Sequence, residues 1–334
     1  MGATENTSPK PGWAKIALYS GSAITAAGAA AVGVLLGQAE LARRTIPLAE
    51  APPPRADGIY GAKFGGPPVH LALLGDSSAA GLGVHRARQT PGALIATGLS
   101  RRLGRPVRLH NLAVVGCTSD RLEYQVEEVL ELRPDIAVIL IGANDVTHRM
   151  GGGGSAVRYL ADAVRRLRLI DTQVVVGTCP DLGSVQPIQP PLRWLARKWS
   201  RQLATAQTIA VVEAGGWTVS LGSLLGPTFA AQPHRMFSFD RYHPSADGYA
   251  LAASVLLPTV VAAMRTPAKQ QAAESGVDGV RSLPQAAVEA ARHAGTEVSR
   301  VRVAGRDRGP AGRWAQLRRR MWEAVRPHEV QEQT

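Results

Sequence analysis

The chain is poor in cysteine, with two in 334 residues, and it contains no CxxC motif or paired His/Cys cluster. A disulfide-stapled scaffold and a structural zinc site are therefore excluded as the basis of the fold. The formal net charge is +12, yet the basic residues are spread along the chain without a long run of one sign. A basic arm for nucleic acid is not indicated, and we expect no nucleic-acid partner.

Three common enzyme motifs are also missing. No GxxxxGK[ST] sequence occurs, and Gly81-Leu82-Gly83 is followed by Arg86 where a dinucleotide-binding motif requires glycine. Ser77 does not lie in a GxSxG motif, because Ala79 occupies the place of the second glycine. These absences argue against a phosphate-binding loop, a dinucleotide fingerprint and the nucleophile elbow of ordinary α/β-hydrolases.

The N-terminal segment, residues 1–45, has no charged residue between Ile16 and Gly37, which is long enough to cross a bilayer as a helix. Basic residues flank this stretch on both sides, so they do not decide its topology. We expect an uncleaved membrane anchor with an extracytoplasmic catalytic domain. A cleaved signal, with a site at Gly37-Gln38-Ala39, would give a secreted protein, and a buried soluble helix is the third alternative.

Residues 46–68 are rich in Pro and Gly and predict a linker. Over residues 69–265, short apolar runs alternate with helical segments, which predicts an open, doubly wound α/β sheet. The expected strands cover 69–74, 107–114, 136–141 and 174–176, and the expected helices cover 92–103, 119–132, 156–169, 191–208 and 246–264. Such sheets bind ligands at the carboxyl ends of their strands.

Residues suited to nucleophilic catalysis follow these strands. Ser77 comes directly after the first strand, in Gly75-Asp76-Ser77, among small residues that leave room for a substrate. A hydroxyl nucleophile needs a base, and the base needs an orienting group. Asp240 and His243 offer both, since a spacing of three residues puts the two side chains on one side of a turn.

Donors for a developing oxyanion are available at the next two strand ends. The second strand leads to Gly116, where a glycine lets a backbone N–H approach a ligand. The third strand leads to Gly142-Ala143-Asn144-Asp145, from which the Asn144 amide can point into the same crevice. Each element alone also fits ordinary turn chemistry.

Taken together, Ser77, Gly116, Asn144 and the Asp240-x-x-His243 pair occur in order at successive strand ends. In this combination the chain resembles the SGNH (GDSL) hydrolase family over roughly residues 69–264. The resemblance implies a three-layer α/β/α fold of the flavodoxin-like type with a five-stranded parallel sheet. It also implies Ser77 as nucleophile, His243 as acid/base and Asp240 as orienting carboxylate, with an oxyanion hole of Ser77, Gly116 and Asn144 and no cofactor or metal.

The expected function is that of a membrane-anchored or exported serine esterase, lipase-like, that hydrolyses carboxylic esters or thioesters of small molecules or lipids through an acyl-enzyme. A deacetylase of cell-envelope carbohydrate is an alternative on the same fold. A non-catalytic, membrane-tethered binding module is an alternative of another class, and the filled nucleophile, base and oxyanion positions count against it. The acyl chain length, the alcohol portion and the oligomeric state are not indicated.

Residues 266–334 form an extension rich in Arg and Ala. Within it, residues 313–326 place Trp314, Leu317 and Met321 on one face of a helix, with arginines mainly on the flanks and the other side. We expect a basic amphipathic helix that binds a membrane or docks on the catalytic domain. Cys117 and Cys179 are both expected near the catalytic edge, and the sequence leaves open whether they form a disulfide.

Overall fold

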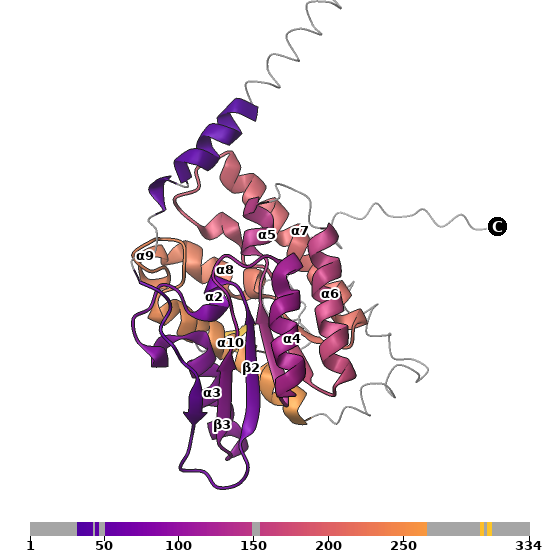
Figure 1. Cartoon of the computed structure of the whole chain (residues 1–334). Coiled ribbons are helices and arrows are strands. Elements are labelled where there is room, and N and C mark those ends of the chain that lie inside the picture. Colours follow the sequence, from indigo (N-terminus) through magenta and orange to yellow (C-terminus); the bar gives the residue numbers. More distant parts are fainter. Residues whose placement is uncertain are drawn as a thin grey trace, which may run out of the picture.

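The computed structural model describes residues 32–42, 44–46, 51–148 and 154–265, together with the backbone of two short strands near residue 305 (Figure 1). The centre of the fold is a sheet in the order β1-β3-β2-β4-β5-β6. Its strands are β1 (Gly58–Tyr60), β2 (Val69–Gly75), β3 (Val107–Asn111), β4 (Ile136–Leu140), β5 (Gln173–Gly177) and β6 (Trp217–Val219). All neighbours are parallel except β1, which runs antiparallel to β3.

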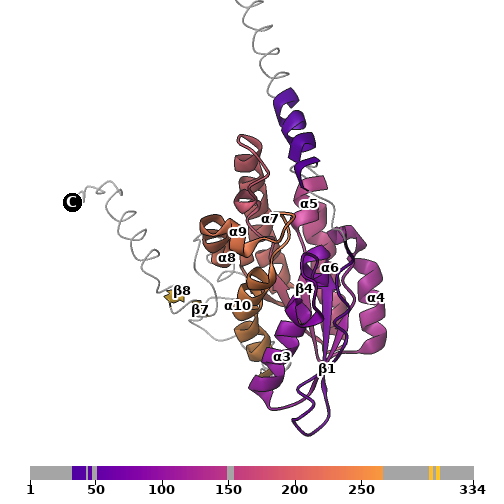
Figure 2. The ribbon, with the colours of Figure 1, turned by 90° about the vertical axis from the view of Figure 1, so that its left-hand side faces the viewer.

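Helices cover both faces of the sheet, which gives three layers (Figure 2). On one face α3 and α10 pack against alternate residues of β2, and on the other face α4 and α6 pack against the intervening ones. The helices are α2 (Ser77–Ala80), α3 (Pro91–Leu103), α4 (Leu122–Leu132), α5 (Ala143–His148), α6 (Gly154–Leu169), α7 (Leu192–Glu213), α8 (Leu221–Ala231), α9 (Pro233–Met236) and α10 (Ala246–Arg265).

Local sequence signals account for the element ends. Every residue of β4 is buried, as expected of an apolar strand covered on both faces. At α3, the Thr90 hydroxyl accepts a hydrogen bond from the N–H of Ala93, Pro91 opens the helix, and Gly104 ends it in the left-handed conformation. The α/β fold of alternating strands and helices predicted from the sequence is therefore confirmed.

The strand order places the carboxyl end of β2 at a topological switch point. From β2 the chain passes through α3 to β3 on one side, and then through α4 to β4 on the other side of β2. The loops that follow β2, β3 and β4 therefore meet at one edge, which is where open α/β sheets bind ligands. We call this end of the molecule the catalytic edge.

Two details differ from the sequence prediction of a five-stranded parallel sheet. The sheet is mixed and has a sixth strand, β1, which lies in residues 46–68 that were predicted as a linker. The predicted strand 107–114 ends earlier, at Asn111, because the Asn111 side chain accepts a hydrogen bond from the N–H of Ala113 and turns the chain. Val114 then lies exposed in the loop instead of in the sheet.

The predicted membrane segments are only partly described. Residues 16–31 lie outside the described residues, and Val32–Ala42 forms a short apolar helix, here called the N-terminal helix. Of the described helices, α10 alone is long and apolar enough to span a membrane, but 56% of that apolar window is buried within the domain. Residues 313–326 lie outside the described residues, and β7 (Val301–Val303) pairs with β8 (Arg306–Arg308) in the preceding part of the extension.

Candidate active site

Ser77 is the first residue of α2, and a single residue separates it from the end of β2. Asp76 caps this helix, and its Oδ1 accepts a hydrogen bond from the N–H of Ser78 at 2.9 Å. Gly75 has a φ of +133°, and a side chain there would collide with the backbone of Leu140 on β4. The turn thus needs glycine, and it places the Ser77 hydroxyl at the switch point of the sheet.

Ser77, His243 and Asp240 form one continuous hydrogen-bonded line. Ser77 Oγ lies 2.8 Å from His243 Nε2, and His243 Nδ1 lies 2.6 Å from Asp240 Oδ2. His243 and Asp240 both come from the turn before α10, in which Arg241 adopts a φ of +55°. The structure therefore brings together the three residues that the sequence singled out, across 166 positions in the chain.

Close packing joins the two turns that carry these residues. Gly83, just after α2, has a φ of +98°, and a Cβ there would lie 3.1 Å from the Cβ of His243. The hydroxyl of Tyr249, in the first turns of α10, donates to the carbonyl of Leu82 at 2.7 Å. Because Tyr249 is fully buried, this contact fixes the His243 turn against the Ser77 turn.

The Asp240 carboxylate is surrounded by donors. Oδ1 accepts from the Ser238 hydroxyl at 2.7 Å and from the N–H groups of Tyr242 and His243, each at 2.9 Å. Burial by itself would raise the pKa of Asp240, but the bonds from the His243 ring, the Tyr242 N–H and the Ser238 hydroxyl lower it to about 2. Asp240 is consequently an anion at neutral pH, and it favours the tautomer of His243 that carries a proton on Nδ1.

The loop between β3 and α4, residues 112–118, forms the other side of the site and is here called the Gly116 loop. Gly116 is exposed there with a φ of +79°. The Asn144 amide, from α5, lies against this loop and donates to the carbonyl of Cys117 at 2.9 Å. The structure therefore places Asn144 beside the Gly116 segment, although its hydrogen bond goes to the backbone of Cys117.

Known proteins share the sequence of this chain over most of the domain that carries the site. Residues 73–251 match the GDSL-like lipase/acylhydrolase family, and this match covers more than half of the chain. The chain belongs to this family. A curated GDSL-like esterase of Mycobacterium tuberculosis is 50% identical over 256 residues, which are 72% of this chain and 81% of that protein. Family membership makes the chain a serine ester hydrolase.

The solved structures that resemble this chain are more distant in sequence. The lipase/acylhydrolase from Enterococcus faecalis is 21% identical, with a TM-score of 0.48, and the match covers 58% of this chain and 96% of that one. LAE5, an alpha/beta hydrolase enzyme from the metagenome of Lake Arreo, is 20% identical, with a TM-score of 0.47, over 59% of this chain and 97% of that one.

One buried residue of this GDSL site was not singled out from the sequence. The Gln125 side chain, on α4, accepts from the N–H of Gly75 at 2.7 Å and donates to its carbonyl at 2.9 Å. The same amide nitrogen lies 3.2 Å from Cys117 Sγ. Gln125 thus connects the turn that holds Ser77 with the Gly116 loop. The signal in the sequence was a lone polar residue on the inward face of an amphipathic helix.

Asp145 supports the same loop from the α5 side. Its carboxylate accepts from the N–H of Ser119 at 3.0 Å and from the Ser119 hydroxyl at 2.7 Å. Since Asn144 and Asp145 are adjacent, the start of α5 contacts both ends of the segment from Cys117 to Ser119. The Gly116 loop is therefore held at its base, while its tip is exposed.

Both cysteines are free and buried. Burial, with a contribution from the nearby Asp76, raises the pKa of the Cys117 thiol to about 11 and that of Cys179 well above its ordinary value. Neither is therefore a thiolate at neutral pH, so neither is an activated nucleophile. Among the described residues, no group of three or more His, Cys, Asp or Glu side chains is arranged to hold a metal ion.

A cavity of about 340 Å³ adjoins the Asp240–His243 turn. Its lining comes from the loop after β5, from α9 and from the segment between α9 and α10, and it combines two phenylalanines and a proline with polar residues: Gln186, Pro233, His234, Phe237, Ser238, Phe239 and Arg241. Gln186 belongs to the loop between β5 and α7, residues 178–191. This loop and the Asp240 turn therefore enclose a space beside the hydrogen-bonded line.

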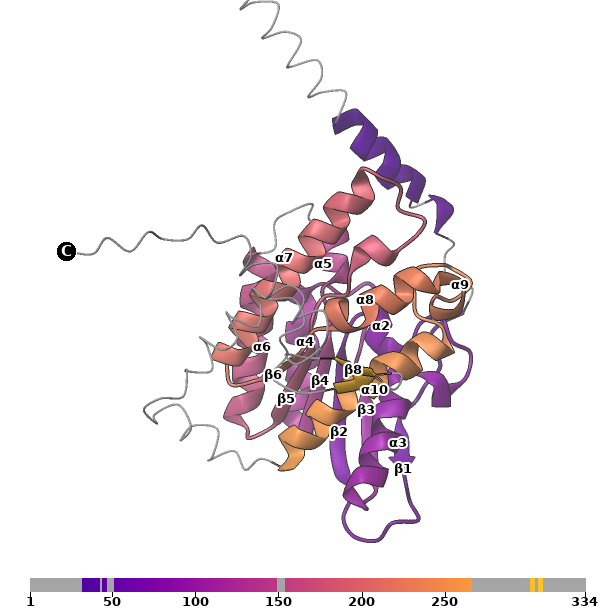
Figure 3. The same cartoon turned by 180° about the vertical axis from the view of Figure 1, so that it is seen from behind.

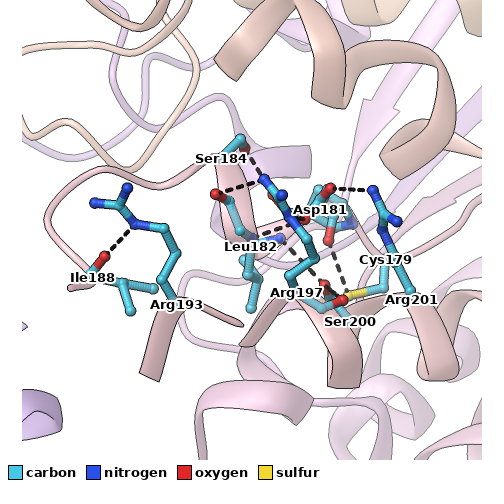
Figure 4. A network of polar contacts seen from close by, with 11 residues as sticks. Cys179, Asp181, Leu182, Ser184, Ile188, Arg193, Arg197, Ser200 and Arg201 are labelled. Carbon is cyan, nitrogen blue, oxygen red and sulfur yellow. Dashed lines mark hydrogen bonds and ion pairs between the residues drawn. The ribbon is translucent and has the colours of Figure 1, made fainter. Parts of the chain in front are cut away.

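Arginines of α7 hold the β5–α7 loop in place (Figure 4). The buried Asp181 forms ion pairs with two of them, Oδ2 with Arg201 Nη2 at 3.1 Å and Oδ1 with Arg197 Nε at 3.4 Å. Arg193, one turn earlier on the helix, donates to the carbonyls of Ile188 at 2.6 Å and Gln186 at 2.7 Å. Three arginines spaced four residues apart thus bind successive parts of the loop that lines the cavity.

Proposed function

We propose that the chain hydrolyses carboxylic esters or thioesters through an acyl-enzyme formed on Ser77. The continuous line Ser77–His243–Asp240, with its hydrogen bonds of 2.8 and 2.6 Å, is the observation that carries this proposal. Ser77 Oγ attacks the ester carbonyl carbon as its proton passes to His243 Nε2. His243 then donates that proton to the leaving alkoxide or thiolate. Asp240 orients the ring and stabilises the imidazolium.

The second half of the reaction uses the same residues in reverse order. A water molecule attacks the acyl carbon while His243 takes its proton, and the bond to Ser77 Oγ breaks as Ser77 regains a proton from His243. The products are a carboxylic acid and the free enzyme, so no net proton is gained by the protein. No oxidation or reduction occurs in either step.

The developing oxyanion is proposed to bind three donors at the catalytic edge. Ser77 is the first residue of α2, and helix geometry leaves N–H groups at that position without an acceptor inside the helix. The exposed Gly116 provides a second N–H, and the Asn144 amide has a further proton beyond the one it gives to Cys117. Such donors act most strongly on the charge of the transition state.

The substrate is proposed to be a small-molecule or lipid ester whose acyl chain lies in the cavity beside the Asp240 turn. Phe237 and Phe239 provide apolar surface there, while Gln186, His234 and Arg241 leave the lining partly polar. The enzyme is proposed to be held at the cell membrane by the uncharged segment 16–37, with the catalytic domain extracytoplasmic. A cleaved signal would instead yield a secreted enzyme.

Labelling with a fluorophosphonate probe tests the proposal directly. Wild-type protein should be labelled and Ser77→Ala should not, because the probe reacts with an activated serine hydroxyl. Ser78→Ala is the matched control, since Ser78 is adjacent to Ser77 and alanine keeps the N–H that bonds Asp76 Oδ1. Absence of labelling in folded wild-type protein would contradict the proposal. A p-nitrophenyl ester series from acetate to palmitate would then define the acyl length.

A further inference from the structure

The N-terminal helix packs on the catalytic domain along one face. Leu35, Ala39 and Ala42 contact the core at the spacing of successive helical turns. Between them, the Gln38 side chain donates to the carbonyl of Pro190 at 2.6 Å and accepts from the N–H of Leu192 at 3.1 Å. The one polar residue within this apolar part of the helix thus binds the backbone at the start of α7.

The exposed flanks on either side of this packed face carry large apolar residues as well. Val32, Val34, Leu36 and Leu41 are each between 52% and 55% exposed. A helix on the surface of a water-soluble domain normally presents polar residues outward, whereas a helix that is apolar all round is surrounded by protein or lipid. Charged side chains begin at Glu40, which pairs with Arg44 at 2.8 Å near the end of the helix.

The start of α7 continues this surface with residues typical of a membrane boundary. Trp194 is 66% exposed, although tryptophan is among the residues that gain most from burial. Lys198, one helical turn later, is also exposed. An aromatic ring followed by a basic side chain on one helical face matches the order of groups across the interface of a bilayer, where Trp lies at the headgroups and Lys reaches water.

The N-terminal helix and the start of α7 lie at the catalytic edge of the molecule (Figures 1 and 3). Other large apolar side chains are exposed in the loops at this edge. Val114 and Val115 precede Gly116, and Phe239 precedes Asp240. Apolar groups are therefore exposed on both sides of the proposed active site as well as on the helix above it.

We propose that the N-terminal helix and Trp194 dock the catalytic domain onto a lipid bilayer with the catalytic edge facing the headgroups. The occupant is lipid because the uncharged sequence from Ile16 leads directly into this helix, and because the Trp194–Lys198 pair matches a bilayer boundary. The Gln38 contacts set the orientation, since they join the helix to the loop that lines the cavity. In this orientation a lipid ester can pass from the bilayer to Ser77, and this consequence rests on the proposed function.

Quenching of Trp194 by brominated lipid tests the docking. The full chain is reconstituted in vesicles of phosphatidylcholine and phosphatidylglycerol whose acyl chains are brominated near the glycerol backbone. The chain holds five other tryptophans, so the quenching of Trp194 is taken as the difference between a protein and the same protein with Trp194→Phe, and this difference should be clearly positive for wild type. Trp199→Phe is the matched control, because Trp199 lies on the same helix but packs partly buried against the core. Equal quenching in wild type and Trp194→Phe would overturn the proposal.

A second variant separates orientation from attachment. Gln38→Leu keeps the helix apolar but removes both hydrogen bonds to the start of α7, so the chain should still float with vesicles while Trp194 quenching falls at least about two-fold. Gln202→Leu, at an exposed position of α7, should leave quenching unchanged. Unchanged quenching in Gln38→Leu would overturn the role of Gln38 in orienting the domain.

Two activity measurements distinguish this inference from the proposed function. Gln38→Leu should lower hydrolysis of a long-chain ester embedded in the vesicles and leave hydrolysis of soluble p-nitrophenyl acetate unchanged. If wild-type protein neither reacts with the fluorophosphonate nor hydrolyses the soluble ester, the proposed function is overturned. Quenching of Trp194 in the same protein would still support docking. Normal soluble activity with no quenching of Trp194 would overturn docking alone.

Discussion

The two sides of the active site are held in different ways. On the base side, one buried carboxylate, Asp240, accepts hydrogen bonds from four donors within four residues of itself. On the oxyanion side, the loop is held from below, at Cys117 by Asn144 and Gln125 and at Ser119 by Asp145, while Val114, Val115 and Gly116 are exposed. The groups of the Ser77–His243–Asp240 line are thus held in place by hydrogen bonds, whereas Gly116, one of the three proposed oxyanion donors, lies on an exposed tip.

The base side is expected to be the more sensitive of the two, and Asp240→Asn should have the largest effect. An amide cannot stabilise the imidazolium, and its NH₂ group favours the wrong tautomer of His243, so kcat should fall about 10⁴-fold. The readout is turnover of p-nitrophenyl acetate. Ser238→Ala removes one donor to Asp240 but keeps the carboxylate, so it should cost far less. A loss below about ten-fold in Asp240→Asn would contradict this role.

Asn144→Ala tests the oxyanion side and should cost less than Asp240→Asn. Losing one oxyanion donor typically lowers kcat about 10²–10³-fold, or about 2.7–4 kcal/mol in the barrier. Because the same amide also binds the Cys117 carbonyl, a small drop in melting temperature is expected as well. Thr147→Ala, an exposed change on the same helix, should alter neither quantity. A loss of stability without loss of kcat would make Asn144 a structural residue only.

The same comparison explains what the sequence could predict. Ser77, Gly116, Asn144, Asp240 and His243 were located because each follows a strand or precedes a helix that local patterns define well. Their proximity follows from parallel strands that end at one edge. The supporting contacts were not predictable, since the partners of Gln125 are backbone groups fifty residues away, which no local spacing encodes.

Elements that depend on tertiary contacts were also missed. The three residues of β1 form a strand only because the edge of β3 offers them partners, and the surrounding Pro and Gly residues locally predict a linker. Val114 continues an apolar run and was expected in a strand, but the Asn111 side chain turns the chain before it. The prediction took an apolar run to be a buried strand, and at the catalytic edge this rule fails because apolar residues such as Val114 are exposed.

A smaller effect is expected from Gln125→Leu, which disturbs both sides through the Ser77 turn. The change leaves the N–H of the buried Gly75 without its acceptor, which should cost about 1–3 kcal/mol of stability. A slight displacement of Ser77 and Cys117 should lower kcat roughly ten-fold, with KM little changed. The measurements are urea denaturation and steady-state kinetics.

Gln207→Leu is the matched control for that variant. Gln207 is also fully buried, and its amide accepts from the N–H of Cys179 at 2.8 Å and donates to the carbonyl of Ile141 at 3.2 Å. It should therefore cost similar stability. It touches neither the Ser77 turn nor the Gly116 loop in the described hydrogen bonds, so kcat should change less. Equal losses of kcat in both variants would show that Gln125 acts through general stability alone.

The smallest effect on activity, with a clear effect on stability, is expected from Asp76→Asn. Asp76 and Asp240 are both buried carboxylates at the site, but burial raises the pKa of Asp76 to about 6, whereas hydrogen bonds lower that of Asp240 to about 2. A raised pKa means that the folded state holds the Asp76 proton more tightly than the unfolded chain does. Ionisation of Asp76 therefore lowers the stability of the fold as pH rises from about 4 to above 6.

The asparagine variant keeps the acceptor for the Ser78 N–H and removes the buried charge. The free energy of unfolding of the variant, relative to that of wild type, should therefore increase between pH 4 and 7 and then level off. The increase should reach about 3 kcal/mol, because the pKa of Asp76 rises from 3.8 to about 6 in the folded state. Asp240 has the opposite sign, because its stabilisation is present above about pH 4 and is lost only as pH falls toward 2. Urea denaturation at several pH values measures the difference, with the exposed Asp162→Asn as control. A constant difference between Asp76→Asn and wild type across this range would show that Asp76 does not titrate there, and that the two carboxylates of the site are not distinguished by their surroundings.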